Sequence, residues 1–258
     1  VQTCALPISF PEVTGHFLNL WAASKKLDVT FEVLNAARES IGSREIANIV
    51  RTEVLPLRPN LVVYYEGGNQ FHLQPLLDRV VDAKPKRPGN GLNVAPKWLQ
   101  EAARYSALLG RVQAAFGFVS SDLDGREWPK PDYKIVWPDG LDEQAPDLAY
   151  PKLPVRLNEI LRDLDRIRGD LSSINSEFAL SSFVWMVRDG MVVNPVQRLG
   201  VLEHLNERMF PFRYADIERL AKFQNRVFAK YAKTHGMPFV DIAGLLPFEP
   251  ELYTDAVH

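Results

Sequence analysis

The last four residues, Asp255-Ala256-Val257-His258, place a carboxylate three positions before an imidazole, after a strand-like run. At this spacing the two groups can share one turn, where the His takes a proton from a nucleophile and the Asp holds the orientation and tautomer of the ring. An Asp and a His also meet at this spacing by chance in many proteins. The pattern therefore predicts chemistry only if the other parts of a hydrolase site occur upstream.

Two polar segments upstream each follow a run with the composition of a strand. Residues 29–34 are apolar and β-branched and lead into residues 35–40, and the near-continuous apolar run 61–65 leads into residues 66–70. Ligands of open α/β sheets bind beyond the carboxyl ends of the strands. Asn69 offers there a planar amide donor beside two glycines, which suits a developing oxyanion.

The order and residues of these segments resemble the SGNH, or GDSL-type, hydrolase superfamily of esterases and lipases, from about Phe10 to the end of the chain. The resemblance implies that the Asn69 side chain and the Ser40 backbone N–H bind the oxyanion. It also implies that His258 is the general base and that Asp255 orients it. The reaction implied is ester hydrolysis through an acyl-enzyme intermediate.

Further residues of the implied substrate cleft are Gly67, Gly68 and His72. The sequence departs from the family pattern at Ser40, where the family has Gly, and at Gln70, where it has Asp. A backbone N–H survives the first change, so Ser40 keeps its implied role.

The nucleophile block of the family is the largest departure. The nucleophilic serine belongs in a Gly-Asp-Ser-like turn ahead of the first helix, and Ser9 lies too close to the start of that helix at Pro11. We therefore predict that the serine and the first strand have been cut off from this chain, which alone should be inactive. Residues 1–9 are expected to be non-native or disordered. Without the natural N-terminus, the compartment cannot be read from the sequence.

Composition narrows the classes of function. Thirty basic and 32 acidic residues, with no Lys/Arg run, lack the electrostatic pattern of a nucleic-acid binder. No stretch has the roughly 18 to 20 apolar residues of a membrane span. Cys4 is the only cysteine and no His has a partner at metal-ligand spacing, so no metal site is expected. The implied chemistry needs no cofactor, and the expected partner is a small-molecule, carbohydrate or lipid ester.

Helical and strand-like segments alternate along the chain, which favours an α/β fold with a parallel sheet. With the resemblance, we expect one three-layer α/β/α domain over 10–258, with a flavodoxin-like sheet and a Pro-rich insertion at about 83–155. The segments are helices at 11–26, 43–57, 98–116, 157–174 and 214–235 and strands at 29–34, 61–65, 178–186 and 238–242. The first helix is expected to face the core through Val13, Phe17, Leu20 and Trp21.

Other interpretations stay open. A non-catalytic α/β domain that binds a carbohydrate or small ligand fits the same scaffold, and so does an O-acyltransferase that uses the same site. Glu66 is expected to be a solvated carboxylate, although it could orient the adjacent loop. Trp185 and Arg188 follow the third predicted strand and could line a pocket, but core and surface roles fit equally.

Overall fold

The computed structural model describes residues 10–81, 98, 102, 106, 108–109, 112, 125–193, 204–249 and 253. Most of the helix predicted at 98–116 lies outside this set. Asp255, His258 and residues 1–9, for which the sequence also makes predictions, lie outside it as well.

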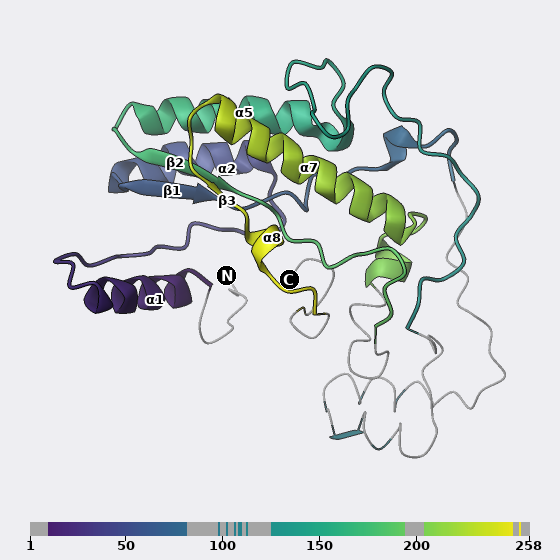
Figure 1. Cartoon of the computed structure of the whole chain (residues 1–258), viewed down its shortest axis with the longest axis horizontal. Helices are drawn as coiled ribbons and strands as arrows, with labels where there is room; N and C mark the ends of the chain where they lie inside the picture. Colours follow the sequence, from purple (N-terminus) through teal and green to yellow (C-terminus); the bar gives the residue numbers. More distant parts are fainter. Residues whose placement is uncertain are drawn as a thin grey trace.

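A small parallel sheet connects the predicted second, third and last strands. It contains β1 (Leu61–Tyr64), β2 (Glu177–Ser181) and β3 (Phe239–Val240), in the order β1-β2-β3 (Figure 1). Parallel neighbours need long crossovers, and a helix lies in each connection. The mixed helix and strand class is therefore confirmed for the described residues, with strands shorter than predicted.

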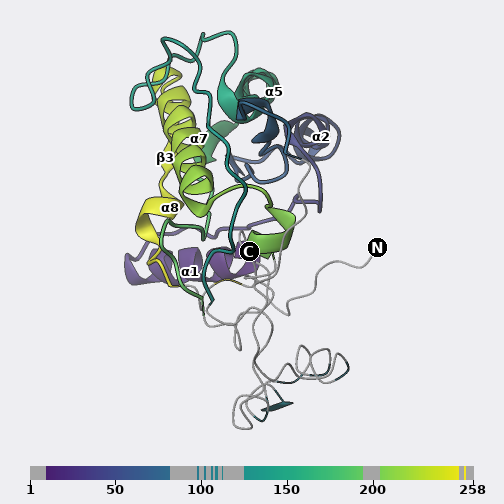
Figure 2. The ribbon, with the colours of Figure 1, turned by 90° about the vertical axis from the view of Figure 1, so that its right-hand side faces the viewer.

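Helices cover one side of this sheet more fully than the other. Figures 1 and 2 show α2, α5 and α7 together on one side and α1 on the opposite side. The α-helices are α1 (Phe10–Ser24), α2 (Ser43–Ile49), α5 (Leu157–Ser172), α7 (Tyr214–Thr234) and α8 (Ile242–Leu245). A π-helical turn, Val50–Val54, and a 3-10 turn, Leu55–Leu57, continue α2 without a break. Single turns occur at Gln74–Leu76, Pro154–Arg156 and His204–Arg208.

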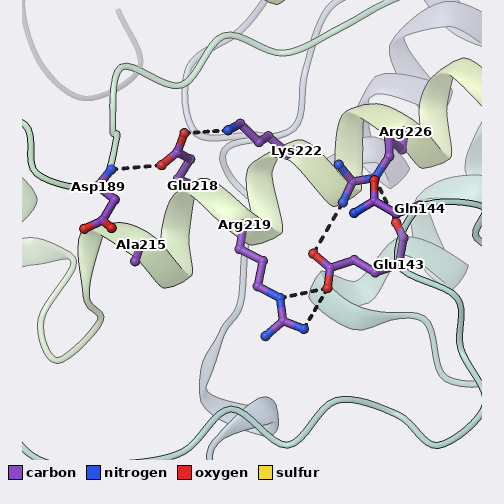
Figure 3. Close-up of a pocket in the computed structure, with 8 residues that line it drawn as sticks. All are labelled: Glu143, Gln144, Asp189, Ala215, Glu218, Arg219, Lys222 and Arg226. Carbon is purple, nitrogen blue, oxygen red and sulfur yellow. Dashed lines mark hydrogen bonds and ion pairs between the residues drawn. The ribbon is translucent and has the colours of Figure 1, made fainter.

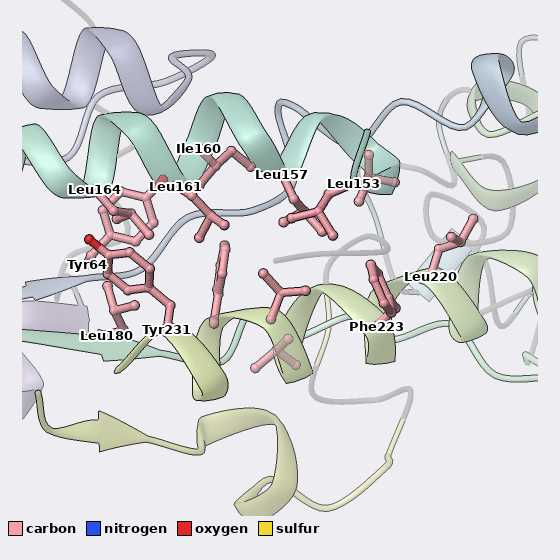
Figure 4. Packing of buried hydrophobic residues seen from close by; sticks show 14 of the residues in the cluster. Tyr64, Leu153, Leu157, Ile160, Leu161, Leu164, Leu180, Leu220, Phe223 and Tyr231 are labelled. Carbon is pink, nitrogen blue, oxygen red and sulfur yellow. The ribbon is translucent and has the colours of Figure 1, made fainter. Parts of the chain in front are cut away.

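The core lies between α5, α7 and the sheet. Apolar residues recur every three to four positions along both helices, so each helix turns one continuous apolar side inward. Figure 4 shows Leu157 and Leu161 of α5 turned toward α7, the helix that carries Leu220 and Phe223, and these four side chains are at most 7% exposed. This packing confirms the predicted helices at 157–174 and 214–235. Strands β1 and β2 contribute Tyr64 and Leu180 to the same core, so this packing also fixes where the two strands end.

The predicted orientation of the first helix is wrong. Helix α1 forms as expected, but Phe17, Leu20 and Trp21 are 63%, 52% and 49% exposed. The covered side of α1 carries Gly15, where a β-carbon would lie 3.3 Å from the Val33 side chain, and Asn19, whose side chain bonds to the Phe31 backbone. Helix α1 therefore packs on the following extended segment through its small and polar residues.

Residues 29–34 are extended but are not a strand of the sheet, contrary to the prediction. Strand β1 is at the edge of the sheet, and residues 29–34 do not pair with that edge. On β1 itself, Leu61 and Val63 are about half exposed, whereas Tyr64 is buried against Phe228 of α7. The sheet face turned away from α5 and α7 is thus only partly covered within the described residues, and a third layer is not established.

The described half of the predicted insertion contributes to the core. Trp128, Tyr133, Leu141 and Leu153 are each buried. An antiparallel bridge joins Ile135 to Leu77, close to the segment that follows β1. Residues 125–155 are therefore part of the folded domain and are more than a surface excursion.

Candidate functional site

The two polar segments predicted from the sequence meet beyond the carboxyl end of β1. The Asn69 side-chain Nδ2 donates a hydrogen bond of 2.8 Å to the Ile41 carbonyl. One residue further, the Gln70 side-chain oxygen accepts the Ser43 N–H at 2.6 Å. Ser43 begins α2, so these two bonds attach the loop after β1 to the turn that leads into α2. The structure thus places the Asn69 amide directly beside residues 40–43.

Ser40 adopts a conformation that favours glycine. Its φ of +58° lies in the left-handed region, which a side chain disfavours and which Gly enters freely. This is the position at which the resembling family has Gly. The backbone at Ser40 thus has the geometry of a glycine turn, and the exposed Ser40 precedes the Ile41 carbonyl that accepts the hydrogen bond from Asn69.

Gly67 and Gly68 are required by close packing. A β-carbon on Gly67 would overlap the side-chain nitrogen of Gln224 from α7, and one on Gly68 would lie 3.1 Å from the Phe183 ring. Gln224 is 1% exposed and its nitrogen has no hydrogen-bond partner among the described residues. The loop is therefore held between α7 and the segment that follows β2.

Glu66 is buried, and the prediction of a solvated carboxylate is wrong. It is 8% exposed, and its two carboxylate oxygens accept the Asn69 N–H at 3.0 Å and the Tyr64 hydroxyl at 3.1 Å. Burial raises the pKa of Glu66 above its ordinary value, although the hydrogen bonds from Asn69, Tyr64 and Gly67 oppose the shift. The alternation of side chains along a strand could have predicted this burial, because Glu66 stands two residues after the inward-facing Tyr64.

Aromatic rings flank the loop at the ends of β1 and β2. The ring of Tyr65 stacks on that of Phe183 with centroids 5.2 Å apart, and Trp185 lies 4.3 Å from Phe71 and 5.5 Å from Phe183. The residue predicted for either a pocket or the core, Trp185, is thus part of an aromatic group beside Gly68. Arg188 lies over the Phe248 ring at 3.9 Å, outside this group.

The chain also returns to this edge shortly before its last residues. Tyr253 is 7% exposed and belongs to the core. Burial raises the pKa of the Tyr65 hydroxyl, and the nearby Tyr253 adds to the shift. Tyr253 therefore lies in the core near Tyr65, which follows β1, whereas Asp255 and His258 lie outside the described residues. His72, in contrast, is exposed.

A separate surface cavity of about 320 Å³ lies along α7 (Figure 3). Its cations are engaged by neighbouring carboxylates, since Arg219 contacts Glu143 at 2.7 Å and Lys222 contacts Glu218 at 2.6 Å. An anionic ligand would have to displace these partners. Its lining residues are Glu143, Gln144, Asp189, Ala215, Glu218, Arg219, Lys222 and Arg226. We assign no reaction to this cavity.

The described part of the chain also bears on metal binding and on membrane spans. In it, no three His, Cys, Asp or Glu side chains gather as a metal site would require. No helix in the same residues has the length and apolar character needed to cross a bilayer. Comparison with protein-family models, curated proteins and solved structures finds no match for this chain.

Proposed function

We propose that this chain belongs to an ester hydrolase of the SGNH type that acts through an acyl-enzyme intermediate. The observation that carries the proposal is the 2.8 Å bond from Asn69 Nδ2 to the Ile41 carbonyl. It brings an amide donor and the glycine-like turn at Ser40 together at one strand end. An oxyanion needs donors from two directions at such a point.

The proposed residue roles follow acyl-transfer chemistry. A serine upstream of Phe10 attacks the ester carbonyl carbon, and His258 accepts its proton while Asp255 orients the ring. The carbonyl oxygen takes up negative charge and is bound by the Asn69 amide and the Ser40 N–H. The alcohol leaves with the proton from His258. Water then attacks the acyl-enzyme by the same route in reverse and releases the acid. Anchoring of Tyr253 near Tyr65 supports the placement of Asp255 and His258.

The proposed parent fold is a three-layer α/β/α sandwich. In it, a further parallel strand carrying the serine pairs with the outer edge of β1, and α1 helps to cover the second face of the sheet. This arrangement accounts for the half-exposed Leu61 and Val63 on β1 and for Phe17 and Trp21 on α1. Full burial of a large apolar side chain is worth about 1.5–3 kcal/mol, so covering these half-exposed side chains would gain roughly half of that each.

Comparison of two polypeptides tests the proposal. One is the 258-residue chain, and the other extends it by the in-frame upstream coding sequence. With p-nitrophenyl acetate, we expect turnover only from the longer polypeptide. In that polypeptide, His258→Ala should lower kcat by about 10³-fold or more. The control is His16→Ala, since His16 is an exposed residue of α1.

Three outcomes bear on the alternatives. Turnover by the 258-residue chain would refute the missing nucleophile, and wild-type turnover by His258→Ala would refute the assigned base. A longer polypeptide that lacks esterase activity but binds carbohydrate would support the non-catalytic binding domain. Acyl transfer to an added sugar, in preference to water, would identify an O-acyltransferase that uses the same site.

A further inference from the structure

Glu66 is a buried carboxylate whose neighbours are neutral donors. Its oxygens accept the Asn69 N–H at 3.0 Å and the Tyr64 hydroxyl at 3.1 Å, and the Gly67 N–H also bonds to it. No Lys or Arg accounts for a shift of its pKa; the first cause is burial, which raises it. Removing a carboxylate from water without a cation costs several kcal/mol. An apolar or amide side chain at position 66 would therefore make the folded protein more stable than the buried carboxylate does.

The contacts of Glu66 converge on the loop that presents Asn69. One oxygen bonds to the Asn69 backbone, and the Asn69 side chain reaches the Ile41 carbonyl. An acceptor fixed at the backbone N–H limits rotation of the peptide from which the side-chain amide projects. A carboxylate accepts more strongly than a neutral group. The Tyr64 hydroxyl in turn holds the other oxygen from within the strand.

Two other contacts hold this loop without any ionisable group. Gln70 accepts the Ser43 N–H at 2.6 Å, and Gly67 lies against Gln224. These contacts fix where the loop lies relative to α2 and α7. Neither contact involves Asn69 itself, whose backbone N–H bonds to Glu66 and whose side-chain amide bonds to Ile41.

We propose that Glu66 is a positioning residue that acts through Asn69, holding its amide in the orientation that binds the oxyanion. This inference rests on the proposed ester hydrolysis. Glu66 is given no role at the reacting atoms, because it is buried and its oxygens are occupied by the Asn69 N–H and the Tyr64 hydroxyl. Misdirection of one oxyanion donor affects the transition state more than substrate binding.

The activity test uses the longer polypeptide and a double-mutant cycle. Asn69→Ala should lower kcat by about 10²–10³-fold. Glu66→Gln should lower kcat by about 10–100-fold with KM changed by less than about threefold, since the donor is displaced and not deleted. In the Asn69→Ala background, Glu66→Gln should cause no further loss beyond about threefold. Glu177→Gln, an exposed Glu at the start of β2, is the matched control and should leave kcat unchanged.

The cycle separates the two proposals. Wild-type kcat in Glu66→Gln, or losses that multiply in the double variant, would overturn the positioning role while a low kcat in Asn69→Ala still supports the proposed function. Wild-type kcat in Asn69→Ala would overturn both. If Glu66→Gln does not fold, Tyr64→Phe replaces it, with an expected loss of about 3–10-fold that disappears in the Asn69→Ala background. An unchanged kcat in Tyr64→Phe would then overturn the role.

A second measurement needs no activity. In the ¹⁵N NMR spectrum of the 258-residue chain, Glu66→Gln should shift or broaden the Asn69 side-chain amide signals, which report the bond to Ile41. Glu177→Gln should leave these signals in place. Unchanged Asn69 side-chain signals in folded Glu66→Gln would overturn the positioning role whatever the reaction catalysed.

Discussion

Gly67 lies so close to Gln224 that any side chain at position 67 would overlap the Gln224 amide nitrogen. The contact joins the loop after β1 to the middle of α7, and Gln224 is 1% exposed. The overlap involves the end of the Gln224 side chain, and because Gln224 is buried and a β-carbon would also lie 3.1 Å from Phe183, little free space is left for it to move into. The glycine is thus determined by a partner 157 positions away in the sequence (224 − 67).

Gly67→Ala should lower the free energy of unfolding of the 258-residue chain by about 1–3 kcal/mol, the usual cost of overpacking. Gln224→Ala should relieve part of this cost, so that the double variant loses less than the sum of the two single losses. Urea melts followed by circular dichroism measure both. The control is Gly169→Ala in α5, where a β-carbon meets nothing within 4 Å and should stabilise the helix by up to about 1 kcal/mol. An unchanged midpoint in Gly67→Ala would contradict the packing.

Ser40→Gly should raise the free energy of unfolding. A non-glycine residue with φ near +58° destabilises the folded state by about 1–2 kcal/mol, and glycine would remove this strain. Glycine also has more freedom in the unfolded chain, which lowers the resulting gain in stability by about 0.4–1 kcal/mol. A net gain of about 0.5 kcal/mol is expected. Ser172→Gly, in the last turn of α5, should instead lose about 0.5 kcal/mol. A loss of stability in both variants would argue against the strained turn.

The sequence predicts those parts of the fold in which local pattern and packing agree. The apolar spacing of residues 157–174 and 214–235 predicts two helices, and α5 and α7 form the core as that spacing requires. The residue type of Gly67 and the position of Ser40 after a strand-like run indicate that both lie in loops. The contacts of Gln224 and Ile41 carry no local signal, because they depend on how distant elements pack. They could be found only from coordinates.

The first helix shows where pattern misleads. An apolar spacing predicts which side of a helix seeks burial, and α1 has that spacing. It cannot say whether a surface to cover it is present. In the structure, Phe17 and Trp21 stay exposed because α1 packs through Gly15 and Asn19 on the segment that follows it. Residues 29–34 likewise have the composition of a strand, but they pair with no strand of the described sheet.

Polar substitution on the exposed side of α1 should therefore cost little in the 258-residue chain. Phe17→Ser is expected to change the free energy of unfolding by less than about 0.5 kcal/mol, as for other surface sites. Leu164→Ala, at a fully buried position, should cost about 2–5 kcal/mol. In the longer polypeptide, Phe17→Ser should cost about 1.5–3 kcal/mol if the proposed strand and α1 pack together. Equal small costs in both polypeptides would contradict the proposed third layer.

Glu66 should make stability fall as pH rises. Burial raises the pKa of Glu66 in the folded state above its ordinary value of 4.5. Between the ordinary and the raised pKa, the folded protein keeps a proton that the unfolded chain has released. The free energy of unfolding therefore decreases with pH through this window. Below 4.5 both states are protonated and the contribution is fully present.

Comparison of the wild type with Glu66→Gln isolates this contribution. The difference in free energy of unfolding between the two, wild type minus variant, should fall as pH increases from about 4 to about 7. Glu177→Gln should keep the slope of the wild type, because Glu177 is exposed. Parallel stability curves for the wild type and Glu66→Gln would show that the carboxylate is not desolvated in the folded state.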